Sequence, residues 1–115
     1  MNIVDPPASA GGSAPSTTDI LARASNQTLT GTAATDNFVF SANFGKDTIT
    51  NFAPGADSIT LDHTAFSGDV NALLAATQDD GNGNTVITVD ANDTITLQHV
   101  LKTQLAAHAS DFHFI

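Results

Sequence analysis

The sequence predicts an all-β fold, a short right-handed parallel β-roll or β-helix that is capped by a short helix, a β-hairpin and a C-terminal strand. Short runs of Thr, Val, Ile and Phe recur after residue 26 between Gly, Asp and Asn, which is the pattern of strands bounded by turns. Asp36, Asp47 and Asp57 are spaced 11 and 10 residues apart. A regular spacing this short indicates a chain that winds coil by coil.

Within the predicted strands, apolar residues alternate with polar ones. Phe38 and Phe40 are separated by one residue, as are Ile59 and Leu61. Alternation of this kind places one face of a sheet in the core and the other in solvent. We therefore predict strands at residues 27–30, 37–40, 48–52, 58–61, 85–89, 94–100 and 112–115.

Two short helices are predicted in the second half of the chain. Apolar residues at helical spacing favour a helix over residues 68–77, with Ser67 or Asp69 as its N-cap. Residues 101–108 form a second candidate, with two leucines one helical turn apart.

A hairpin is predicted between these helices. The run 79–84 contains only Asp, Gly and Asn, and it predicts a tight turn that leads into a hairpin of residues 85–98. If Val89 faces Ile95, the apolar residues share one face and residues 91–93 form a three-residue loop. An Asn or Asp of that loop, Asn92 or Asp93, would then adopt the left-handed conformation.

The N-terminal segment differs from the rest of the chain. Residues 1–25 are rich in Pro, Ala, Ser, Gly and Thr, which predicts a flexible linker or lead-in, with a helical turn conceivable at 18–24. Residues 26–115 are predicted to form one small domain. The first residues lack the basic start and apolar run of a secretory signal peptide, and no stretch has the length of a membrane span.

The charge balance excludes several classes of partner. Twelve acidic residues, all of them Asp, stand against three Lys and Arg, which gives a formal net charge of -9. Such a chain repels nucleic acid and anionic membrane surfaces, so we expect neither as a partner, and no membrane insertion. No cysteine is present to form a disulfide.

Aspartates begin a repeated pattern of Asp, a polar residue and an apolar residue. The pattern occurs at Asp36, Asp47, Asp57 and Asp93, and a glycine stands two residues before two of them, as Gly45 and Gly55. Half-turns of about ten residues would place Asp36 and Asp57 on one edge and Asp47 on the opposite edge. Two interpretations are open: aspartates that cap turns before strands, or aspartates that bind calcium between stacked turns.

A family resemblance supports the second interpretation. The segment GTAATDNFV, residues 31–39, resembles the glycine-rich nonapeptide GGxGxDxUx of RTX proteins, with Gly31, Asp36 and Phe38 at matching positions. Thr32 and Ala34 stand where that pattern has its other glycines. The segment from 37 to 62 and the C-terminal tail look like the regions that follow the last RTX repeats, so the resemblance covers residues 27–115.

The resemblance implies a function. RTX proteins are calcium-binding bacterial exoproteins whose repeats form a β-roll, and they leave the cell by type I secretion with an uncleaved C-terminal signal. Carried to this chain, it implies a secreted, extracellular protein whose partners are the preceding domains of its parent and the type I secretion machinery. The implied calcium positions are Gly31, Asp36, Gly45, Asp47, Gly55 and Asp57. The implied secretion signal is Asp111, Phe112, His113, Phe114 and Ile115.

We therefore expect a non-catalytic C-terminal domain of a secreted RTX-type exoprotein, one that caps a calcium-binding β-roll and carries the secretion signal. The chain has no HExxH motif and no recognisable spacing of a nucleophile and a histidine. The alternative is a small extracellular adhesin or carbohydrate-binding β domain. The absence of Trp and Tyr argues against the alternative, because aromatic platforms commonly stack on ligand rings.

Overall fold

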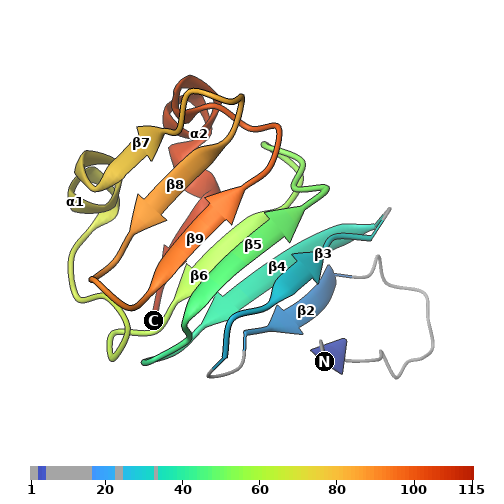
Figure 1. Cartoon of the computed structure of the whole chain (residues 1–115). Coiled ribbons are helices and arrows are strands. Elements are labelled where there is room, and N and C mark those ends of the chain that lie inside the picture. Colours follow the sequence, from blue (N-terminus) through green and yellow to red (C-terminus); the bar gives the residue numbers. More distant parts are fainter. Residues whose placement is uncertain (1–2, 5–16, 23–24, 33) are drawn as a thin grey trace.

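The computed structural model describes residues 3–4, 17–22, 25–32 and 34–115. These residues form mostly β-strands, arranged in two mixed five-stranded sheets with a few short helices. Figure 1 shows the two sheets as two layers of the molecule. The predicted all-β class is confirmed at this level.

The first sheet, sheet A, has the strand order β1-β2-β4-β6-β10. Only the β1–β2 pair is antiparallel, and the other three pairs are parallel. The strands are β1 (Ile3–Val4), β2 (Thr17–Leu21), β4 (Thr35–Phe40), β6 (Ser58–Leu61) and β10 (Phe112–Phe114).

The second sheet, sheet B, has the strand order β3-β5-β9-β8-β7. The pairs β3–β5 and β5–β9 are parallel, whereas β9–β8 and β8–β7 are antiparallel. The strands are β3 (Thr28–Thr30), β5 (Lys46–Thr50), β7 (Thr77–Asp79), β8 (Thr85–Thr88) and β9 (Thr94–Leu97).

From β2 to β6 the chain alternates between the two sheets. Strands β2, β4 and β6 lie in sheet A, and β3 and β5 lie in sheet B. The parallel partners are close to one another in sequence: Thr28 pairs with Thr48, and Asn37 pairs with Ser58. The chain therefore returns to the same sheet after roughly twenty residues, a period typical of stacked structural repeats.

The core lies between the sheets because every second strand residue points inward. In β4 the burial alternates along the strand, with Asp36, Phe38 and Phe40 fully buried. Ile49 in β5 and Ile59 in β6 are also fully buried and belong to the same apolar cluster. The predicted alternation is therefore confirmed, and burial of each large side chain contributes about 1.5 to 3 kcal/mol.

Two helices connect the sheets near the β7 end of the molecule (Figure 1). Helix α1 (Val70–Ala75) follows β6 and precedes β7, and helix α2 (Lys102–Ala107) follows β9. Each helix buries one leucine completely, Leu73 from α1 and Leu105 from α2. Both predicted helices are confirmed with shorter bounds, and Asp69 is the N-cap of α1 because its side chain accepts the Ala72 N–H.

All predicted strands are present, but one prediction near the N-terminus is wrong and one strand was missed. The helical turn considered at residues 18–24 is contradicted, because Thr17–Leu21 is strand β2 and pairs with β4. Strand β7 was not predicted, because Thr77–Asp79 contains a single buried residue, Thr77. The remaining residues of the expected lead-in lie outside the described residues, apart from β1, residue 22 and residue 25.

The predicted register of the hairpin is also wrong. Ile87 pairs with Ile95 and Thr85 with Leu97, a shift of two residues from the expected pairing. Neither Asn92 nor Asp93 has a positive φ. The loop instead closes around Asp90, whose Oδ1 accepts the backbone N–H groups of Asn92 and Asp93 at 2.8 and 2.9 Å.

Candidate functional site

Five buried aspartates lie at or just before the beginning of strands. Asp36 and Asp47 are the second residues of β4 and β5, and Asp57, Asp93 and Asp111 immediately precede β6, β9 and β10. Their side chains are 0 to 8% exposed. Among the described residues the one ion pair joins Asp62 to His63, so these five buried carboxylates have no cationic partner there.

Four of these carboxylates accept backbone N–H groups from a neighbouring turn or strand of the same sheet. Asp57 Oδ1 accepts the N–H of Asp36 at 2.9 Å, and Asp47 Oδ1 accepts the N–H of Gln27 at 3.0 Å. On the next strand of each sheet, Asp93 Oδ1 accepts the N–H of Gly45 and Asp111 Oδ2 accepts the N–H of Gly55, at 2.8 Å each. We call Asp47, Asp57, Asp93 and Asp111 the inter-strand aspartates.

Two carboxylates also close their own turns. Asp36 Oδ2 accepts the N–H of Thr32 at 2.6 Å, and its Oδ1 accepts the Thr32 hydroxyl at 2.7 Å. Asp57 Oδ2 accepts the N–H of Ala53 at 2.9 Å. In both turns the donor residue stands four positions before the aspartate, so the carboxylate caps the bend that precedes the strand.

The expected edges are confirmed. Asp36 and Asp57 lie in neighbouring positions of sheet A, because Asn37 pairs with Ser58. Asp47 lies in sheet B, where its neighbour Lys46 pairs with Thr94. The structure therefore brings Asp36 and Asp57 together and keeps Asp47 apart from them.

The three predicted glycines permit close approaches between turns. Gly45 and Gly55 have φ values of 89° and 87°, which L-residues with a side chain rarely adopt. A Cβ at Gly45 would lie 2.9 Å from the carbonyl carbon of Ser25, and a Cβ at Gly31 would lie 2.7 Å from the Asn51 carbonyl oxygen. These glycines are therefore required by backbone geometry.

Burial leaves Asp47 the least well compensated of the aspartates. Its Oδ2 is buried and has no hydrogen-bond partner in the part of the chain that the structure describes. Burial and, to a smaller extent, the charge of Asp93 raise the pKa of Asp47 to about 6, although the bond from the Gln27 N–H opposes this shift. Burial also raises the pKa of Asp57, and the charges of Asp36 and Asp111 add to that effect.

In this arrangement, hydrogen-bond donors already surround two of the predicted calcium ligands, Asp36 and Asp57. Calcium takes about six to eight oxygen ligands, but both carboxylate oxygens of Asp36 and of Asp57 face N–H or O–H donors. Donor hydrogens carry partial positive charge and repel a cation at the same position. Within the described residues no three His, Cys, Asp or Glu side chains gather into a group able to hold a metal ion.

Three of the predicted secretion residues, Phe112–Phe114, form β10 at the end of sheet A, with Asp111 just before it and Ile115 just after it. Asp111 accepts the Gly55 N–H, Phe112 is 6% exposed in the core, and His113 points to solvent. Phe114 packs on Phe66 with ring centroids 6.0 Å apart. Ile115 is 63% exposed, although its backbone N–H donates to the Leu61 carbonyl at 3.0 Å.

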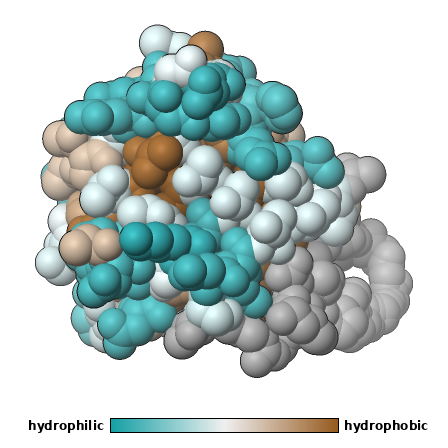
Figure 2. Space-filling view, viewed as in Figure 1, coloured by the Kyte–Doolittle hydropathy of each residue, from teal (hydrophilic) through white to brown (hydrophobic). Residues whose placement is uncertain are grey.

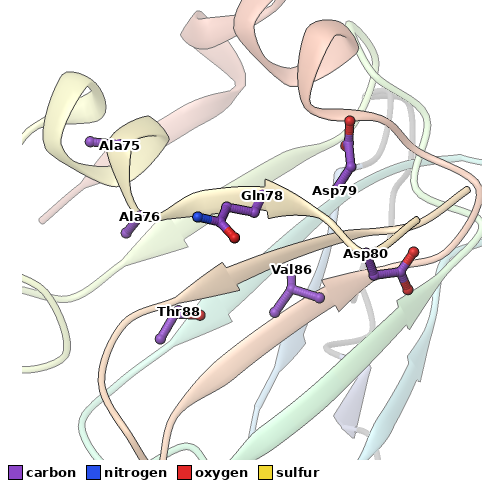
Figure 3. Close-up of a pocket in the computed structure, with 7 residues that line it drawn as sticks. All are labelled: Ala75, Ala76, Gln78, Asp79, Asp80, Val86 and Thr88. Carbon is purple, nitrogen blue, oxygen red and sulfur yellow. The ribbon is translucent and has the colours of Figure 1, made fainter. Parts of the chain in front are cut away.

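Outside the aspartate turns, a hollow of about 490 Å³ opens beside β7 (Figure 3). Gln78, Asp80, Val86 and Thr88 contribute to its lining. Asp80 belongs to the predicted tight turn, which is confirmed because its Oδ1 accepts the N–H groups of Asn82 and Asn84. The four histidines, in contrast, are all exposed and lie on separate segments.

Sequence reasoning missed one polar contact that positions the cap. Asp79 Oδ1 accepts the N–H of Lys102 at 2.8 Å and the Thr85 hydroxyl at 3.1 Å, which joins β7 to the beginning of α2. No local pattern could have shown this contact, because the donor of the shorter bond is 23 residues away. Asp93 is already part of the predicted aspartate pattern, and Asp111 could have been added to it, since it also precedes a strand.

No family model, curated protein or solved structure matches this chain. In the described part of the chain, no helix is long and apolar enough to cross a membrane. The functional interpretation therefore depends on the residues themselves and on the resemblance of their pattern to RTX proteins.

Proposed function

We propose that this chain is a non-catalytic C-terminal domain of a secreted RTX-type exoprotein, which caps a right-handed β-roll and carries an uncleaved type I secretion signal. The observation that supports the roll is the alternation of β2 to β6 between two sheets, with parallel partners in each. Stacked coils of roughly twenty residues are what a roll of paired nine- or ten-residue half-turns requires.

The antiparallel end of sheet B supports the capping role. The hairpin β8–β9 and strand β7 replace the parallel coils there, and Leu73 and Leu105 from the two helices enter the core. A wound sheet leaves an unpaired edge and an open core at its end, and such edges promote aggregation. A meander and two helices at that end protect both features.

In this proposal, calcium binds to β-roll coils that precede this domain in the parent protein. Tandem glycine-rich repeats there would bind calcium outside the cell, where neutralisation of their carboxylates drives folding by ligand linkage. Inside the cell, scarce calcium would leave the repeats unfolded and exportable. In this chain, N–H donors occupy three of the four carboxylate oxygens of Asp36 and Asp57.

The calcium dependence of the melting temperature distinguishes binding by this chain from binding by the preceding repeats. We expect the isolated chain to melt at the same temperature in millimolar calcium and in chelator, and a fusion to tandem GGxGxDxUx repeats to gain stability with calcium. A calcium-dependent rise in the melting temperature of the isolated chain would show that its own aspartates bind the ion.

Secretion is tested with a reporter fused to the N-terminus of the chain and co-expressed with a type I exporter. We expect the reporter in the medium, and its retention in cells when residues 111–115 are deleted. A variant with Thr35→Glu, an exposed change far from the tail in sequence, is the matched control and should be exported normally. Retention of the intact fusion, with the chain soluble and folded in the cells, would contradict the proposal.

A further inference from the structure

The outer face of sheet B presents mostly polar side chains in rows that run across the strands, and the longest row crosses all five. One row follows the strand register from Gln78 through Val86, Thr96 and Thr48 to Thr28. Strands in a sheet are about 4.8 Å apart, so this row is about 19 Å long. Figure 2, drawn in the same view as Figure 1, shows pale and hydrophilic residues over this sheet around a small hydrophobic patch.

Two further rows flank the first. On one side Thr88 pairs with Thr94, which pairs with Lys46. On the other side Thr50 pairs with Thr30, and the Thr50 hydroxyl donates to the Thr30 hydroxyl at 3.2 Å. Most side chains in these rows are threonines, whose hydroxyl groups can both donate and accept hydrogen bonds.

The first row ends in the hollow beside β7 (Figure 3). Val86 and Ala76 give this hollow apolar surface, and Gln78 and Thr88 give it polar groups. The Gln78 amide and the Thr88 hydroxyl make no hydrogen bond to any other described residue. Their donors and acceptors are thus available to a ligand that lies in the hollow.

The charge of this face differs from that of the chain as a whole. The chain carries a formal net charge of -9, yet among the outward-facing strand residues of β3, β5, β8 and β9 the one charged side chain is Lys46. Asp79 and Asp80 lie at the far end, beside the hollow. The surrounding negative field disfavours an anionic polymer, whereas a neutral polyhydroxylated ligand experiences no such repulsion.

We propose that the outer face of sheet B binds a neutral linear polysaccharide, with one sugar unit in the hollow and the chain extended across the strands. The spacing between strands is close to the length of one hexose unit in an extended chain, so successive units meet successive threonines. Because no aromatic ring lies on this face, the contact consists of hydrogen bonds and the Val86 side chain, and we expect weak binding. This binding is independent of the capping and secretion roles.

The test is an NMR titration of the ¹⁵N-labelled chain with cellohexaose, laminarihexaose and β-1,4-mannohexaose, each to about 10 mM. Hexagalacturonate serves as the anionic comparison. We expect at least one neutral hexasaccharide to shift the amide signals of β5, β7, β8 and β9, and hexagalacturonate to leave them unchanged.

Three variants locate the site. Thr48→Glu, in the centre of the first row, should weaken binding about tenfold or more, and Gln78→Ala should weaken it about threefold. Thr35→Glu introduces the same charge at an exposed position of sheet A and should bind as the unmodified chain does. Melting temperatures within a few degrees of the unmodified chain establish that the variants are folded.

Four results would overturn the proposal. These are the absence of shifts with all three neutral hexasaccharides, shifts confined to sheet A, equal affinity of Thr48→Glu, and equal or tighter binding of hexagalacturonate. Shifts that depend on protein concentration without sugar, and that Thr48→Glu abolishes, would assign the face to a second copy of the chain instead.

Discussion

Replacement of Asp57 by alanine tests whether backbone compensation is what stabilises the aspartate turns. The two oxygens of Asp57 accept the N–H groups of Asp36 and Ala53, each at 2.9 Å, and the residue is 2% exposed. In Asp57→Ala both donors lose their partner. The unsatisfied buried N–H of Asp36 costs about 1 to 3 kcal/mol. Loss of the part-buried bond from the exposed Ala53 adds about 0.5 to 1.5 kcal/mol, so the gross loss is about 1.5 to 4.5 kcal/mol.

Relief of charge repulsion offsets part of this loss. Burial and the charges of Asp36 and Asp111 raise the pKa of Asp57, so its ionised form is itself disfavoured in the folded chain. We therefore expect a net decrease of about 1.5 to 3 kcal/mol in the free energy of unfolding, which is large for a domain of this size. Urea unfolding followed by far-UV circular dichroism measures it, because the chain lacks Trp and Tyr.

Two comparison variants make the reasoning refutable. Asp69→Ala removes a single exposed bond, from the Ala72 N–H to the α1 N-cap, and should cost about 1 kcal/mol. Asp57→Asn keeps the size and one acceptor oxygen but removes the charge. If Asp57→Ala costs no more than Asp69→Ala, or if Asp57→Asn stabilises the chain, electrostatic repulsion outweighs the hydrogen bonds and the argument fails.

Three further predictions concern acidity, glycine and the cap. The folded-state pKa of Asp47 is raised from 3.8 to about 6. Its contribution to stability is therefore greatest below about pH 4, falls between pH 4 and 6, and is constant above. The difference in unfolding free energy between the unmodified chain and Asp47→Asn should change by about 1 to 3 kcal/mol across that window, and a difference that does not change with pH in urea unfolding would contradict this prediction. Gly45 and Gly81 both have positive φ, but of these two only Gly45 would bring a Cβ against backbone atoms. Gly45→Ala should therefore lower the free energy of unfolding by about 1 kcal/mol more than Gly81→Ala. Equal losses would mean that the backbone strain of a positive φ accounts for the whole effect. Leu105→Ala should lower the free energy of unfolding by about 2 to 5 kcal/mol. Leu101→Ala, at a residue 40% exposed, should lower it by less than about 1 kcal/mol. Similar losses for the two variants in thermal or urea unfolding would show that α2 does not close the core.

The strands and their edges could be predicted because both depend on local patterns. Alternation of Phe38 and Phe40 identifies an inward face without knowledge of the partner strand. The spacing of Asp36, Asp47 and Asp57 likewise predicts which turns share an edge, and the register of β4 and β6 confirms this. The spacing of the aspartates and the alternation of apolar residues can both be read from short stretches of sequence, and the folded chain keeps them.

The hairpin register could not be predicted, because a distant contact decides it. Alternation alone permits Val89 opposite Ile95, and that pairing shares the apolar faces equally well. In the structure Asp93 is buried and accepts the Gly45 N–H, 48 residues earlier in the chain. This contact places Asp93 just before β9, and the loop around Asp90 lengthens to accommodate it.

The chemical role of the aspartates also depends on information that the sequence lacks. A carboxylate after a glycine turn has the same residues around it whether it caps the turn or binds an ion. The choice depends on which groups face the two oxygens, and at Asp36 and Asp57 these groups are donors. At Asp47 one oxygen has no partner among the described residues, so the same pattern yields a different electrostatic outcome.

The hydrogen bonds of the inter-strand aspartates join later segments of the chain, including the cap, to earlier turns. In all four bonds the carboxylate belongs to the later residue and the N–H to the earlier one, with separations of 20, 21, 48 and 56 residues for Asp47, Asp57, Asp93 and Asp111. Each earlier turn is therefore completed only when a later strand is in place. Closing the 56-residue loop costs about 0.9 kcal/mol more than closing the 21-residue loop, which one hydrogen bond barely offsets. The turns around Gly45 and Gly55 consequently depend on the packing of α1, α2 and the hairpin, and the stability of the wound strands is set by the segment that follows them.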